Sequence, residues 1–145
     1  MTGAKTAKGS DSNIVTIVEK TTNITSINKI TVDTSGLVHD DDAKKQEIAS
    51  HIQALLTKDA VEAGIFNPRD KKGYEVSVTI RNMKQQINVR AVYAIVNVLN
   101  PTKEAVYSFA SVETSEGLRT LDHIEDTFAK SAIQAIKKPL EQPTE

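Results

Sequence analysis

The sequence contains no cysteine and no tryptophan, and only three tyrosines and three phenylalanines among its 145 residues. Without cysteine, the chain forms no disulfide and no thiolate zinc site, and it has no cysteine nucleophile. Proteins that bind single-stranded nucleic acid stack bases on exposed aromatic rings, which are scarce here. The formal net charge is −1, so the chain also lacks the excess of basic residues that binds a phosphate backbone. We therefore expect no nucleic-acid partner.

Long apolar runs are absent as well. No stretch of about 18 apolar residues occurs, so the sequence predicts no membrane-spanning helix. Residues 1–13 have no large apolar side chain after Met1 and lack the apolar core of an intact signal peptide. We expect residues 1–23 to form a flexible polar leader, in which the apolar run at 14–18 can make a short edge strand, and residues 140–145 to form a polar tail.

No recognisable catalytic or cofactor motif is present. The six glycines are scattered, so there is no glycine-rich phosphate loop, and neither Ser35 nor Ser115 lies in a Gly-x-Ser-x-Gly elbow. The three histidines, His39, His51 and His123, form no His-Glu-x-x-His pair. We therefore expect a protein that is not an enzyme and that binds no cofactor.

The run His39-Asp40-Asp41-Asp42 is the best candidate for a metal site, because calcium and magnesium prefer oxygen ligands. It lacks the alternate spacing, the glycine and the closing glutamate of an EF-hand loop. Consecutive acids before an amphipathic stretch instead favour helix capping, with Asp40 or Asp41 as the N-cap. We expect capping and no metal site.

The remaining chain alternates between strand and helix patterns. A strand is expected at 26–33. A helix follows, with apolar residues at steps of three and four from Ile48 to Ala63 and a glycine cap at Gly64. Strands are predicted at 74–81, 87–99 and 105–112, with a polar bend at 83–86 and a loop at 114–120. A second helix is expected from Leu121 to Lys138, ended by Pro139.

This order predicts one α+β domain over residues 24–139: a strand, a helix, a three-strand meander and a helix. Each helix has a single apolar stripe, so both must pack on a sheet, and placing both on one face of a mixed or antiparallel sheet is the simplest arrangement. The first strand and the strand after the first helix would then be parallel neighbours or separated ones.

The segment from Asp40 to Phe66 resembles a known family. The helix with Ile48, Ile52, Leu55 and Leu56 leads into Glu62-Ala-Gly-Ile-Phe66, similar to the helix and Gly-x-Phe segment of TolB N-terminal-like and CsgG-like domains of outer-membrane lipoproteins. The order of elements follows those domains from Val32 to Ile136, although the loop at 67–73 is longer and the lipid-bearing cysteine is absent. The resemblance implies a non-catalytic, periplasmic domain, attached to the outer membrane only through a lipid anchor that was removed or replaced by Met1.

These observations favour a domain of the bacterial envelope that binds another envelope protein or itself. The candidate partner-binding residues are Ile65, Phe66, Tyr93 and Tyr107, with Tyr93, Tyr107 and Phe109 expected to cluster on one sheet face. For that cluster core packing is the favoured role, and a partner-binding groove is the alternative. A structural subunit of a phage-like tail or ring is a second hypothesis, favoured by a closed ring. A small ligand-binding protein or enzyme is a third, and it requires a deep pocket lined by residues such as His123, Glu125 and Tyr93.

Overall fold

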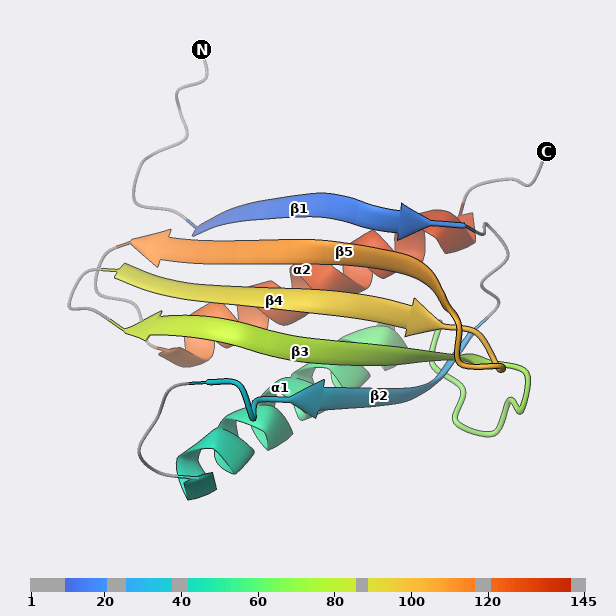
Figure 1. Ribbon diagram of the computed structural model, residues 1–145, viewed down its shortest axis with the longest axis horizontal. Helices are drawn as coiled ribbons and strands as arrows, with labels where there is room; N and C mark the ends of the chain where they lie inside the picture. Colours follow the sequence, from blue (N-terminus) through green and yellow to red (C-terminus); the bar gives the residue numbers. More distant parts are fainter. Residues whose placement is uncertain (1–9, 21–25, 38–41, 86–88, 117–120, 142–145) are drawn as a thin grey trace, which may run out of the picture.

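The computed structural model describes residues 10–20, 26–37, 42–85, 89–116 and 121–141. In these parts of the chain it has five strands and two helices: β1 (Ser10–Glu19), β2 (Ile27–Asp33), α1 (Asp42–Glu62), β3 (Tyr74–Gln85), β4 (Val89–Leu99), β5 (Ala105–Glu116) and α2 (Leu121–Glu141). The strands form one sheet in the order β1-β5-β4-β3-β2 (Figure 1). Only β2 and β3 run parallel, and the other neighbouring strands are antiparallel.

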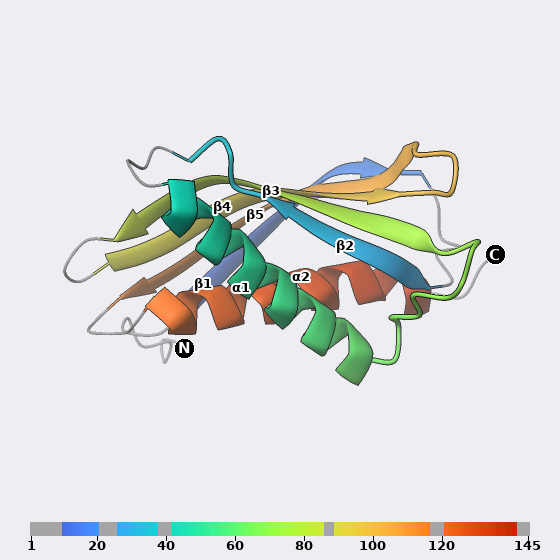
Figure 2. The same cartoon turned by 90° about the horizontal axis from the view of Figure 1, so that it is seen from below.

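Both helices lie on the same side of the sheet, which leaves its other face open (Figure 2). The expected α+β architecture, with two helices on one face of a mixed sheet, is therefore confirmed. The parallel pairing of β2 with β3 follows from the intervening α1, because a parallel crossover needs a connection long enough to return the chain to the same end.

β1 enlarges the sheet beyond the four strands expected. The short strand considered at 14–18 extends from Ser10 to Glu19, where it pairs antiparallel with β5. The sheet domain thus includes residues before position 24, and 10–19 are not part of a flexible leader. The pairing satisfies the outer backbone groups of β5, which a four-strand sheet would leave unpaired. Residues 1–9 and 142–145, at the ends of the expected leader and tail, lie outside the described residues.

Several elements are longer than the sequence patterns indicate. β3 continues through the predicted bend at 83–85 because a β-bulge between Ile80 and Asn82 absorbs an extra residue and lets pairing resume. β5 includes 114–116, for which the sequence predicts a loop. α2 reaches Glu141, so the predicted end of this helix before Pro139 is wrong, and Pro139 lies in its last turn. The proposed N-cap and metal residues at 39–41 lie outside the described residues.

The core lies between the sheet and the helices. On β4 the buried residues alternate as Val92, Ala94, Val96 and Val98, each less than 1% exposed. Helix α2 contributes a stripe of buried apolar side chains: Ile124, Phe128, Ala129, Ala132, Ile133, Ala135 and Ile136. The equivalent stripe of α1 is Ile48, Ile52, Leu56 and Ala60. The apolar residues that recur every 3.6 positions on the helices thus pack against those that alternate on the strands, and together they form one apolar layer.

Polar contacts with buried carboxylates join the two helices beside the apolar core. His51 Nδ1 of α1 contacts Glu125 Oε1 of α2, and Glu125 is 2% exposed. Lys130 Nζ of α2 lies 4.0 Å from Asp59 Oδ1 of α1 and 3.1 Å from Asp126 Oδ1. Asp59 is 7% exposed, and its other oxygen has no hydrogen-bond partner among the described residues. Burial raises the pKa of Asp59, and the nearby Lys130 offsets only part of that effect.

Gly64 ends α1 in the way the sequence predicts. Its φ of 76° is left-handed, its N–H donates to the Val61 carbonyl at 3.0 Å, and the Ile65 N–H donates to the Ala60 carbonyl at 3.1 Å. These two bonds form a Schellman motif, which satisfies the carbonyls at the end of the helix. The turn also brings Ile65 and Phe66 back to the start of β2.

Replacing Gly64 with alanine should lower the free energy of unfolding by about 1 kcal/mol, because a Cβ is unfavourable at this positive φ. No atom lies within 4 Å of the added Cβ, so the cost comes from the backbone alone. Gly36→Ala is the matched control, since its Cβ also meets open space and its φ is not positive. Urea denaturation measures both variants, and equal stability of the two would contradict this account.

Replacing Asp59 with asparagine should stabilise the fold at pH 7, because burial disfavours the charged carboxylate that the neutral amide replaces. Because the folded-state pKa is raised above its unfolded value, the folded protein holds this proton more tightly. The contribution of Asp59 is therefore most favourable below the unfolded pKa and declines as pH rises through the folded pKa. Thermal unfolding should show the advantage of the variant at pH 7 shrinking toward pH 3. A constant advantage would refute the assignment.

Candidate functional site

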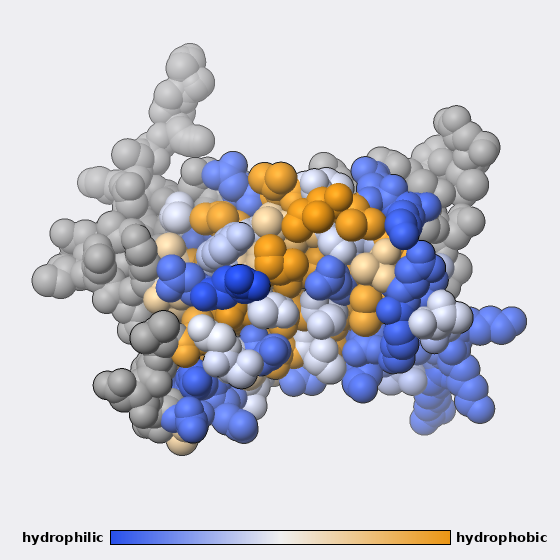
Figure 3. Space-filling model, viewed as in Figure 1, coloured by the Kyte–Doolittle hydropathy of each residue, from blue (hydrophilic) through white to orange (hydrophobic). Residues whose placement is uncertain are grey.

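The open face of the sheet is divided into a polar half and an apolar half. Over β2 and β3 the side chains of this face come from pairs such as Lys29 with Glu75, Thr31 with Ser77 and Asp33 with Thr79. Over β4, β5 and β1 they are mostly apolar, and Figure 3 shows apolar side chains gathered on that side of the face. A half-solvated sheet normally carries polar residues outward, so the apolar half is the feature to explain.

The apolar half consists of six residues on three neighbouring strands, which together are called the apolar patch. Cross-strand pairing places Tyr93 beside Val112, Ile95 beside Ala110, and Ala110 beside Val15. Ile17 lies two residues further along β1, at the bulge between Thr16 and Val18. The members of the patch are therefore Val15, Ile17, Tyr93, Ile95, Ala110 and Val112.

Three members of the patch are strongly exposed for apolar or aromatic side chains. Val15 is 63% exposed, Ile17 56% and Tyr93 40%. A shallow hollow of about 370 Å³ lies beside Tyr93 and is lined by Asn82, Ala91, Tyr93, Val112 and Thr114. Apolar surface next to a hollow, with an aromatic ring at its edge, is typical of surfaces that bind other proteins.

The four residues predicted to bind a partner do not form one surface. Tyr93 lies in the apolar patch, whereas Tyr107 is 5% exposed and faces the helices, where its hydroxyl donates to the Ala135 carbonyl at 3.3 Å. Ile65 is 9% exposed and belongs to the core, and the half-buried Phe66 packs against it. The segment with Ile65 and Phe66 lies beside the start of β2, where Phe66 forms a parallel bridge with Ile27.

The expected cluster of Tyr93, Tyr107 and Phe109 on one sheet face is wrong. Tyr107 and Phe109 share the covered face, with their ring centroids 5.5 Å apart, whereas Tyr93 points to the open face. Residues 93 and 107 belong to different strands, so their relative orientation depends on the pairing register, which the sequence does not reveal. That register places Tyr93 opposite Val112 and Tyr107 opposite Val98. For Tyr107 and Phe109, core packing is the observed role.

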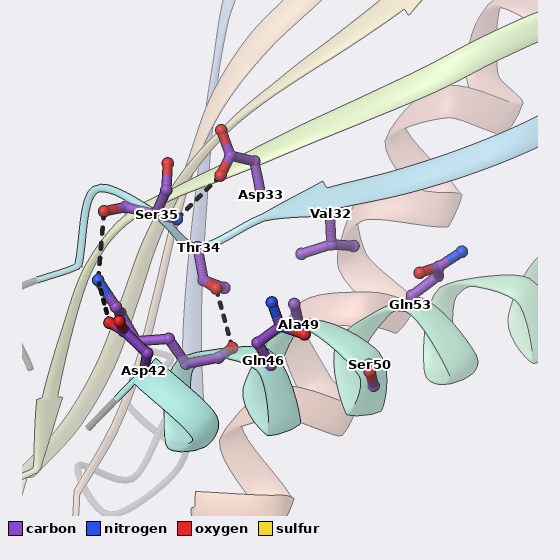
Figure 4. A pocket seen from close by; sticks show the side chains of 10 residues that line it. Val32, Asp33, Thr34, Ser35, Asp42, Gln46, Ala49, Ser50 and Gln53 are labelled. Atoms are coloured by element: carbon purple, nitrogen blue, oxygen red, sulfur yellow. Dashed lines mark hydrogen bonds and ion pairs between the residues drawn. The ribbon is translucent and has the colours of Figure 1, made fainter.

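A second hollow, of about 510 Å³, lies between the end of β2 and the first turns of α1 (Figure 4). Thr34 Oγ1 donates to the Lys45 carbonyl at 2.8 Å, and Lys45 Nζ lies 3.4 Å from the Ser35 carbonyl and 3.6 Å from Asp42 Oδ1. The Ser35 N–H donates to Asp33 Oδ1 at 2.8 Å and helps to hold the pKa of that carboxyl below its usual value. These bonds attach α1 to β2, which gives the polar residues here a structural role.

Candidate catalytic residues do not converge. Glu125 of α2 is buried against His51 of α1, on the covered side of the sheet, whereas Tyr93 lies on the open side. The two therefore cannot line one pocket, and the side chain of His123 lies outside the described ones. Glu113, a fully buried carboxylate on β5, also faces the helices. Among the described residues, no three acidic or histidine side chains are grouped so that they could hold a metal ion.

Neither helix, over its described residues, combines the length and apolar character needed to cross a bilayer.

The comparisons with known proteins concern the fold. No protein-family model and no curated protein sequence matches the chain. Two solved structures of PelC dodecamers from Paraburkholderia phytofirmans are similar to it. One, a point variant, has a TM-score of 0.55 and 8% identity over 93% of this chain and 99% of the PelC chain. The other has a TM-score of 0.56 and 10% identity over 92% and 100% of the two chains. At such identities the likeness establishes a shared fold.

Proposed function

We propose that this chain is a non-catalytic domain of the bacterial cell envelope that works by assembling with other proteins, and in particular with copies of itself. The apolar patch on the open sheet face is the observation that carries the proposal. Exposed apolar area costs free energy in water, and binding another protein surface recovers it. The open face of a sheet is also a rigid platform, so little order would be lost on binding.

The comparisons support the self-assembly part of this proposal. Both similar structures are dodecamers, and the shared fold extends over more than nine tenths of this chain and nearly all of PelC. A fold that forms rings or other closed oligomers in one protein provides edges and faces that a distant relative can use in the same way. The net charge of −1 also favours self-assembly, because copies that are close to neutral repel one another little.

The envelope location and the absence of catalysis belong to the same proposal. The resemblance of the segment from Asp40 to Phe66 to TolB N-terminal-like and CsgG-like domains supports a periplasmic location. The separation of Tyr93 from Glu125 by the sheet argues against the enzyme site that these residues could have formed. A closed ring alone would also fit a phage-like assembly, so cellular location is needed to distinguish the two.

Purified protein should be an oligomer at micromolar concentration. Sedimentation velocity from about 1 to 100 μM should give a mass that is a multiple of the 15.8 kDa chain, because burial of the apolar patch favours association. Raising the salt concentration should not dissociate it, since the patch carries no charge. A monomer over the whole concentration range would contradict self-assembly.

Fractionation of cells that express the native gene tests the location separately. The protein should appear in the periplasmic or outer-membrane fraction, together with a periplasmic marker enzyme. A protease added to spheroplasts should degrade it while a cytoplasmic marker stays intact. Recovery only with the cytoplasmic marker would rule out the envelope proposal without affecting the oligomer measurement.

A further inference from the structure

The strand β1 forms an unprotected edge of the sheet. It pairs with β5 on one side only, and its central residues 13–18, Asn-Ile-Val-Thr-Ile-Val, include no charge and no proline. Soluble proteins usually protect edge strands with lysine, proline or a covering segment, because unpaired backbone groups attract a further strand. Within this central stretch of the described strand, the protective feature is the bulge between Thr16 and Val18.

The opposite edge, β2, is covered in contrast. The Ile27 N–H donates to the Ile65 carbonyl at 2.8 Å, and the Asn67 N–H donates to the Ile27 carbonyl at 2.8 Å. Further along, Gln53 Nε2 of α1 donates to the Ile30 carbonyl at 2.9 Å. The fold therefore satisfies backbone groups at one edge with its own chain and side chains. β1 has no comparable covering bond from another described element on its outer side.

The unprotected edge and the apolar patch are continuous. Val15 of β1 pairs with Ala110 of β5, and Ala110 pairs with Ile95 of β4. We propose that β1 pairs antiparallel with β1 of a second copy about a two-fold axis, so that Val15 and Ile17 of the two copies lie beside one another and the two patches join side by side into one apolar surface. The inference rests on the proposed self-assembly and names the surface through which it begins.

The choice of a second copy follows from what the rest of the surface offers. Among the described residues, Val61 on α1 is the one large apolar side chain of comparable exposure outside the patch. An isolated valine on a helix provides no unpaired strand edge, so the best match to the β1 edge is β1 of a second copy. A surface that matches itself makes an isologous contact, in which two copies are related by a two-fold axis. The uncharged stretch at 13–18 lets two such edges approach without like-charge repulsion.

The test places lysine on the edge and compares it with lysine elsewhere. Val15→Lys and Ile17→Lys, singly and together, put charges into the proposed contact twice, once from each copy. Val61→Lys is the matched control, because Val61 and Ile17 have the same exposed fraction of 56%. The double variant should raise the dissociation constant of the dimer by at least about 100-fold, measured by sedimentation equilibrium. Val61→Lys should leave it unchanged within about threefold.

A second pair of variants guards against loss of the strand itself. Val15→Thr and Ile17→Thr keep β-branched side chains, which suit a strand, and remove much of the apolar contact. They should weaken association in the same direction while circular dichroism and the melting temperature of the monomer stay unchanged. Because the chain has no cysteine, single cysteines at Val15 and Val61 can also be cross-linked with a bis-maleimide. Only the cysteine at position 15 should give covalent dimers in high yield.

The outcomes separate this inference from the proposed function. If the protein associates but the patch variants leave its mass unchanged, or Val61→Lys is equally disruptive, the surface is wrong and self-assembly stands. If the unmodified protein is a monomer at every concentration, both are overturned. Loss of association in the patch variants alone, with the fold intact, supports the two-fold contact.

Discussion

The structure depends on one constraint: two amphipathic helices can cover only one face of a five-stranded sheet. Burial of that face against α1 and α2 provides the core, and it determines the register in which Val92, Val96 and Phe109 point inward. The same register fixes which residues point outward, since neighbours on a strand face opposite sides. Tyr93 and Ile95 are exposed to the open side because their neighbours are needed in the core. The packing of the covered face thus determines which residues are exposed on the open face.

Local patterns predicted much of this arrangement. The apolar steps from Ile48 onward and Gly64 located α1 and its end to within a residue or two, because a helix reports its buried face and its cap through nearby residues. β4 has apolar residues on both faces and lies in the middle of the sheet. Strand ends were harder: the bulge after Ile80 and the pairing of Ser10–Glu19 depend on hydrogen bonds to distant strands, which no local pattern encodes.

The candidate site was less accessible to sequence reasoning for the same reason. Tyr93 was found, but its neighbours Val15 and Val112 come from other strands and meet it only through the sheet order β1-β5-β4. One signal in the sequence could have indicated the patch. β4 has apolar residues on both faces, whereas two helices are enough to cover only one face of the sheet. Tyr107 was misplaced because aromatic character alone does not say which side of a strand is covered. The proposed assembly role rests on the apolar surface that the helices leave uncovered.

The most direct test of this account is backbone hydrogen exchange of the protein at low and high concentration. If copies pair through β1, at the edge of the apolar patch, amides of β1 should exchange more slowly at high concentration, while amides of α1 around Val61 should exchange at the same rate in both samples. Unpaired N–H groups on the outer side of β1 should show the largest change. Equal exchange of β1 at both concentrations, in a protein whose mass shows that it associates, would contradict the claim that the open face and its edge are the assembly surface.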